Sequence, residues 1–129
     1  MNKQEKIKFF DKCVRHYFFN VFHLHRYELF ISQDKNDHDL AMATTYWNSI
    51  ESGDSNVSIC YDRKWIEQKD LTKKVIDEVA FHEVCEALLM ELSQLIICRF
   101  IAEKDIPNAV HRVIRTLENT IYHKVKLVK

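Results

Sequence analysis

Apolar residues recur every three to four positions along the first 22 residues, which is the period of an α-helix. The spacing predicts an amphipathic helix over roughly Lys3 to Phe22, with one apolar stripe packed on the core. The stripe consists of Ile7, Phe10, Val14, Phe18 and Val21.

Three short segments after this helix are rich in β-branched and aromatic residues, and we expect each to form a strand. They are Tyr27–Ser32, Met42–Trp47 and Val57–Tyr61. The polar cluster Gln33 to Asp37 predicts a hairpin connection after the first strand. A loop over Asn48 to Asn56 predicts that the second and third strands are adjacent and antiparallel.

The second half of the chain has helical periodicity. Asp70 is the expected N-cap of a long helix that runs to roughly Phe100. One broad side of it carries Phe81, Val84, Leu88, Leu92 and Leu95, and the opposite side carries Glu83, Ala87 and Glu91. His82 and Glu86 fall between the two sides, at the border of the core.

A final helix should begin near Asp105 with Pro107 in its first turn, where proline costs no hydrogen bond. Its apolar stripe is Val110, Val113 or Ile114, Leu117 and Ile121. The order of elements therefore predicts an α+β protein: a helix, about three short strands, a long helix and a last helix.

Composition narrows the function. At 129 residues the chain is expected to form one domain spanning residues 1–129. A single glycine, Gly53, and a single proline exclude a flexible linker and a phosphate-binding glycine loop. Nineteen basic residues balance 19 acidic ones, so no nucleic-acid partner is expected. The only feature that favours a DNA-binding module is the short basic tail from His123 to Lys129.

The spacing of the cysteines and the length of the apolar runs indicate the cellular compartment of the protein. Cys13, Cys60, Cys85 and Cys98 lack metal-ligand spacing and read as reduced core residues. No uncharged apolar run reaches membrane-spanning length, so no membrane association is expected. We expect a cytoplasmic protein, in the host cytoplasm if it is virally encoded.

The pentapeptide His82-Glu83-Val84-Cys85-Glu86 carries the candidate chemistry. Positions i and i+4 share one helix face, so His82 and Glu86 can reach one metal ion. Glu83 is turned by about 100° and can address a water bound to that metal. The alternative is an ordinary i,i+4 pair on a half-exposed helix face.

Together, the order of elements and this motif resemble the zincin-like metallopeptidase fold and its His-Glu-x-x-His helix. The segments 81–86 and 111–119 also resemble small phage and prophage proteins of this minimal type. The resemblance implies a Zn²⁺ cofactor, with His82 as the first metal ligand and Glu83 as the catalytic general base. Glu86 stands where the family has its second histidine. For the third ligand the resemblance favours His111 on the last helix, with Glu118, two turns on, as the alternative.

These expectations lead to two functions of different classes. The first is a zinc-dependent metallopeptidase whose peptide substrate adds as a strand to the edge of the sheet, at either Met42–Trp47 or Val57–Tyr61. The second is a non-catalytic phage or prophage interaction protein on a degenerate zincin-like fold. Its contact anchors would be four aromatic residues: Tyr46, Trp47, Tyr61 and Trp65.

Overall fold

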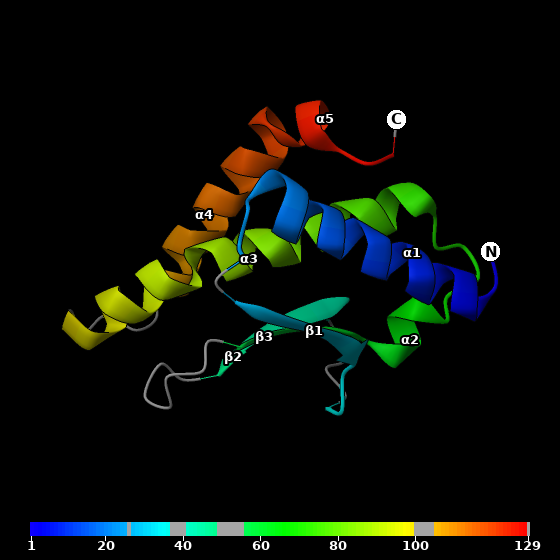
Figure 1. The fold of residues 1–129 in the computed structure, drawn as a ribbon, viewed down its shortest axis with the longest axis horizontal. Coiled ribbons are helices and arrows are strands. Elements are labelled where there is room, and N and C mark those ends of the chain that lie inside the picture. The colour runs from blue at the N-terminus through cyan, green and yellow to red at the C-terminus, as the bar shows by residue number, and fades with distance from the viewer. Residues whose placement is uncertain (26, 37–40, 49–55, 100–104, 129) are drawn as a thin grey trace.

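A computed structural model describes residues 1–25, 27–36, 41–48, 56–99 and 105–128, with the backbone alone for 91–99, 105, 106 and 109. The described residues form five α-helices, one π-helical segment and a three-stranded mixed sheet (Figure 1). The expected α+β class is therefore confirmed.

The N-terminal helix agrees with its predicted bounds. Helix α1 spans Lys3–Arg15 and continues as a π-helical segment, η1, over His16–Val21. Asn2 begins it with a capping box, since its side chain accepts a hydrogen bond from the Glu5 N–H while the Glu5 carboxylate accepts one from the Asn2 N–H. The predicted stripe faces the core, with Phe10, Val14 and Phe18 fully buried.

The three strands form where expected, but their order differs from the prediction. Strand β1 spans Glu28–Gln33, β2 Ala43–Asn48 and β3 Asn56–Tyr61, in the order β1-β3-β2. β2 and β3 are antiparallel, as predicted. The hairpin expected after the first strand is wrong, because β1 pairs in parallel with β3 instead. β3 is the most buried of the three strands, and a central position covers both of its edges.

Helix α3 spans Lys73–Arg99, so it begins later than expected. Asp70 is not its N-cap. The Thr72 hydroxyl accepts a hydrogen bond from the Val75 N–H at 3.3 Å and takes that role. The four-residue helix α2, Arg63–Ile66, precedes it and was not predicted; Asp62 caps it. Phe100, the expected end of the long helix, lies outside the described residues.

The sides of α3 also required correction. Phe81 and Val84 are fully buried, as predicted, but Glu83 and Ala87 on the opposite side are only 5% and 2% exposed. The reason is that α3 packs on α1 and α4 and also against β2, so both sides are covered. The side chains of Glu91, Leu92 and Leu95 lie outside the described part of the chain.

The last helix, α4, spans Asp105–Thr120 with Pro107 in its first turn, and a four-residue helix, α5, spans Tyr122–Val125. Ile114 is buried while Val113 is 47% exposed, which decides between the two alternatives for the stripe. α4 lies against α3 (Figure 1). Helices α1, α3, α4 and α5 lie on one side of the sheet, and α2 lies beside it.

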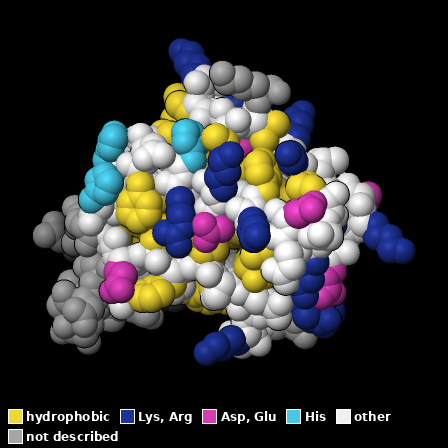
Figure 2. All heavy atoms as spheres, turned by 45° about the vertical axis from the view of Figure 1, so that its right-hand side comes forward, with side chains coloured by type: hydrophobic (Ala, Val, Ile, Leu, Met, Phe, Trp, Pro, Cys, Tyr) yellow, Lys and Arg dark blue, Asp and Glu magenta, His cyan; other side chains and the backbone are white. Residues whose placement is uncertain are grey.

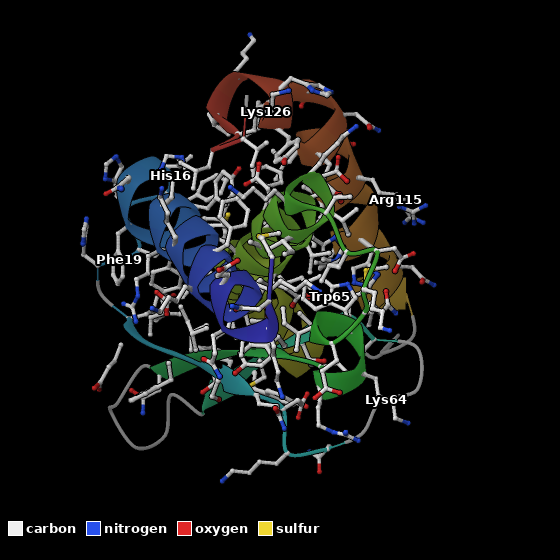
Figure 3. The ribbon with its side chains drawn as sticks, turned by 90° about the vertical axis from the view of Figure 1, so that its right-hand side faces the viewer. His16, Phe19, Lys64, Trp65, Arg115 and Lys126 are labelled. Carbon is white, nitrogen blue, oxygen red and sulfur yellow. The ribbon has the colours of Figure 1, made fainter. Side chains whose placement is uncertain are left out.

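Two of the four aromatic residues considered as contact anchors belong to the core. Tyr61 and Trp65 are 8% and 5% exposed, and both pack edge-on against Phe10. Figure 3 shows Trp65 inside the molecule and its neighbour Lys64 at the outside. The predicted anchor role is therefore wrong for this pair.

Cys13, Cys60 and Cys85 are free and buried, in agreement with the sequence, and the Cys98 side chain lies outside the described residues. The face drawn in Figure 2 carries Lys and Arg side chains dispersed among acidic and apolar ones. Among the described residues, no helix is both long and apolar enough to span a bilayer.

Candidate metal centre

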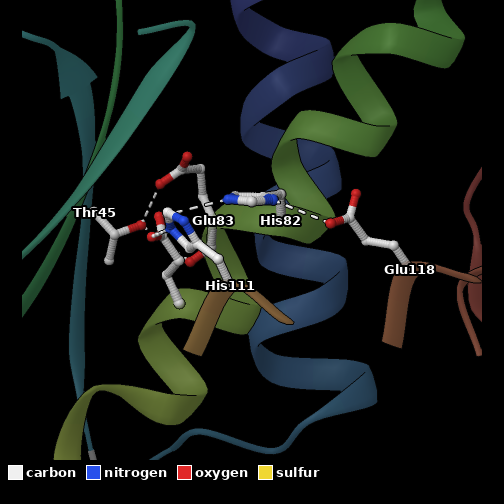
Figure 4. Close-up of polar contacts among 6 residues, drawn as sticks. Thr45, His82, Glu83, His111 and Glu118 are labelled. Atoms are coloured by element: carbon white, nitrogen blue, oxygen red, sulfur yellow. Dashed lines mark hydrogen bonds and ion pairs between the residues drawn. The ribbon is translucent and has the colours of Figure 1, made fainter. Parts of the chain in front are cut away.

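Two helices supply the side chains of the candidate site. His82, Glu83 and Glu86 lie in the middle of α3, and His111 and Glu118 lie on α4. The contact between α3 and α4 brings them together across 25 residues of sequence, from Glu86 to His111 (Figure 4). His82 and Glu86 are 32% and 26% exposed, at the border of the core as the periodicity predicted.

His82, Glu86 and His111 each direct one potential ligand atom to a common point, and these atoms lie within 4.8 Å of one another. His111 Nε2 is 2.9 Å from Glu86 Oε1, and His82 Nε2 is 4.0 Å from Glu86 Oε2. Ligands of a tetrahedral zinc ion with bonds of about 2.0–2.1 Å lie ~3.3 Å apart, a value between these two separations. Two imidazoles and one carboxylate form a donor set that suits zinc. Within the described residues no other group of this kind occurs.

Glu83 is almost completely buried, on the side of α3 that faces the sheet. The Thr45 hydroxyl on β2 lies 2.6 Å from Glu83 Oε2 and 3.0 Å from the Glu83 carbonyl oxygen. Burial, followed by the neighbouring Glu86 carboxylate, raises the pKa of Glu83 well above its usual range, although the hydrogen bond from Thr45 opposes that rise. A carboxyl group with a raised pKa is better matched to general-base chemistry near neutral pH.

Glu118 does not lie in the group of potential metal ligands, the role considered for it as an alternative to His111. Its Oε1 lies 3.2 Å from His82 Nδ1, the ring nitrogen on the far side from Glu86. His111, not Glu118, therefore joins the group of three. The two residues are seven positions apart on α4, so both face α3 and bracket His82 and Glu86.

A hollow of about 770 Å³ opens above the group. Residues 41–45 form one wall, α3 forms another with Val75, Val79 and its site residues, and His111 and Glu118 contribute from α4. β2 is an edge strand, whereas β3 is central. Among the described residues β2 is therefore the edge strand of the two proposed for substrate pairing, and it borders the hollow.

Thr45 is the site residue that sequence reasoning missed. A threonine in a β-strand is unexceptional, and only the packing of β2 on α3 shows that its hydroxyl reaches Glu83.

Comparison with known proteins returned no match to a family model, to a curated protein or to a solved structure. The function is therefore argued from the site alone.

Proposed function

We propose that this chain is a zinc-binding protein of zincin-like architecture with the machinery of a metallopeptidase. The observation that carries the proposal is the convergence of His82, Glu86 and His111, with the Glu83 carboxyl beside them. An ordinary i,i+4 pair would require only His82 and Glu86. A third potential ligand from another helix, aimed at the same point, favours a metal site.

His82, Glu86 and His111 would hold the ion and leave a fourth position open to the hollow. Bound zinc supplies Lewis-acid chemistry: it acidifies a water molecule and polarises a carbonyl group. Glu83 accepts the proton of the attacking water, and Thr45 holds the Glu83 carboxylate in place. A peptide added alongside β2, the edge strand of the described sheet, would run along the hollow beside these groups.

Glu86 sets the expected strength of this chemistry. A carboxylate ligand lowers the net charge of a zinc centre relative to a third neutral imidazole, so bound water is less acidic. We therefore propose weak hydrolysis and retained metal binding.

The alternative, a non-catalytic interaction protein, has less support. Its anchors required exposed aromatic residues, and Tyr61 and Trp65 are buried in the core. It would gain support if the protein bound zinc without cleaving any peptide.

The test is the metal content of protein purified without chelator or nickel resin. We expect about one zinc per chain. His82→Ala and His111→Ala should lose most of it, and His123→Ala, a matched change on the exposed face of α5, should retain it. Substoichiometric zinc after reconstitution, or wild-type content in His82→Ala, would refute the site.

A second measurement tests the base. Glu83→Gln should keep the fold and the zinc but lose cleavage of unstructured peptides at matched zinc content. Equal activity in Glu83→Gln and wild type would end this assignment.

A further inference from the structure

We infer that Glu118 is a positioning residue: it holds the proton of His82 on Nδ1 and so leaves Nε2 unprotonated and directed toward Glu86 and His111. This inference rests on the proposed metal site for its purpose. The contacts that support it involve only side chains of this chain, so they can be tested on protein stripped of metal.

The contact of His82 with Glu118 determines which ring nitrogen carries the proton. Glu118 Oε1 is 3.2 Å from His82 Nδ1, within hydrogen-bond range. An ionised carboxylate only accepts, so Nδ1 must donate. In the neutral ring the proton then resides on Nδ1, and Nε2 keeps its lone pair.

The surroundings of Nε2 fit this state. The nearest carboxylate oxygen, Glu86 Oε2, is 4.0 Å away, which is too far for a hydrogen bond. Nε2 therefore neither donates a hydrogen bond to Glu86 nor accepts one from it. It faces the point at which Glu86 and His111 also converge.

The site contains two histidine–glutamate contacts between α3 and α4, and they are not equivalent. His111 meets Glu86 through Nε2, the atom that also belongs to the group of three. His82 meets Glu118 through Nδ1, with its Nε2 left for the group. The ring is rigid, so the contact of Nδ1 with Glu118 by itself directs Nε2 away from Glu118 and toward the centre. A metal-bound histidine commonly donates its other N–H to a carboxylate in this way, which fixes the ring and its tautomer.

Helix α4 carries both Glu118, which positions His82, and His111, the proposed third ligand. His111 and Glu118 lie two turns apart on the face that contacts α3. Docking of one rigid helix therefore delivers the ligand to one side of the cluster and the orienting carboxylate to the other.

The first test reads the tautomer directly in metal-free protein. Long-range ¹H–¹⁵N NMR of ¹⁵N-histidine-labelled protein at pH 8, above the ordinary imidazole pKa of about 6.5, separates the protonated from the bare ring nitrogen. The His82 signal is assigned by its loss in His82→Gln. We expect protonated Nδ1 in the wild type and loss of that preference in Glu118→Ala. A proton on Nε2 in the wild type, or the same tautomer in Glu118→Ala, overturns the inference.

The second test measures zinc affinity by competition with a chromogenic chelator. Glu118→Ala should bind zinc about 10- to 100-fold more weakly. Glu118→Gln should recover most of the affinity, because its amide oxygen can still accept from Nδ1. Glu78→Gln is the control: Glu78 lies one turn before His82 on α3, and its nearest ion-pair contact is Lys74. It removes the same charge and should leave affinity within a few fold.

The outcomes separate this inference from the proposed function. If wild-type protein fails to bind zinc but shows the Nδ1 tautomer that depends on Glu118, the proposed function fails and the positioning of His82 stands. If wild-type protein binds zinc and Glu118→Ala binds it equally well, the positioning role fails alone. If Glu78→Gln and Glu118→Ala lose zinc affinity equally, the cause is the loss of one negative charge near the site and not the contact with His82, and the inference is overturned.

Discussion

Asp77 on α3 is fully buried and joins three parts of the chain that are distant in sequence. Its carboxylate accepts hydrogen bonds from the Tyr17 and Tyr122 hydroxyls, both at 2.6 Å, and from the Val128 N–H at 3.2 Å. Tyr17 in turn accepts from the Leu127 N–H at 3.0 Å. The network fixes the chain after α4 to η1 and α3, and so helps to hold the helix that carries His111 and Glu118.

The cost of Asp77→Ala follows from these donors. A hydrogen bond to a charged group contributes about 1.5–3 kcal/mol, and a buried donor left unpaired costs about 1–3 kcal/mol. Two tyrosine hydroxyls at the lower end of that range, with a smaller share for Val128, give a loss of about 3–5 kcal/mol. At roughly 2.1 cal/mol/K of unfolding entropy per residue, about 0.27 kcal/mol/K for 129 residues, Tm falls by roughly 11–18 °C.

Urea and thermal unfolding followed by circular dichroism measure this loss. Tyr122→Phe removes one donor and should cost about 1–1.5 kcal/mol. Asp11→Ala is the matched control, because the Asp11 carboxylate is half-exposed and its pair with Arg15 contributes only about 0.3–0.5 kcal/mol. If the free energy of unfolding of Asp77→Ala lies within 1 kcal/mol of that of the control, the reasoning that three unpaired donors destabilise the variant is refuted.

Three further outcomes are expected. Burial and the Asp77 hydrogen bond raise the pKa of Tyr17 and of Tyr122, so the fold favours their neutral forms; Tm should be unaffected by these groups below pH 10 and fall above it, and a Tm that stays flat to pH 11 would contradict this. Burial raises the pKa of Cys85 to about 12 and also raises the pKa of Cys13 and of Cys60, so in a Cys98→Ser background the native protein should show no fast thiol reaction with Ellman's reagent at pH 8, while the unfolded protein reacts fully. Glu86→His should retain zinc and increase peptide turnover, because a neutral ligand leaves the metal-bound water more acidic; unchanged turnover at equal zinc content would count against the charge argument.

Periodicity was enough to predict the three long helices, α1, α3 and α4, and the position of the motif, but not the four-residue helices α2 and α5. The stripe of α1, the border position of His82 and Glu86, and the placement of Pro107 each follow from local spacing, and local spacing is what a single sequence contains. The nearness of His111 to Glu86 could be anticipated because an apolar stripe beside His111 had to pack on the core.

Long-range packing could not be predicted in the same way. No local feature of the sequence distinguishes a β1–β2 hairpin from a parallel β1–β3 pair, because the composition of a strand does not determine which strand it pairs with. The burial of Glu83 was missed because a glutamate opposite an apolar stripe is normally solvated. Only the presence of the sheet beneath α3, and of Thr45 on it, changes that environment.

The burial of Glu83 also bears on the choice between a metal site and an ordinary ion pair. The buried Glu83 carboxyl lies beside the Glu86 carboxylate, and burial, followed by that neighbouring charge, raises the pKa of Glu83 and favours its protonated form. The partners of the two carboxyl groups differ, because His111 contacts Glu86 and the Thr45 hydroxyl hydrogen-bonds to Glu83. A divalent cation between His82, Glu86 and His111 would place two positive charges beside both carboxylates and stabilise their ionised forms. Ionised Glu83 is the form that can accept a proton, so a bound metal would prepare the base, and the convergence of His82, Glu86 and His111 remains the observation that carries the proposed site.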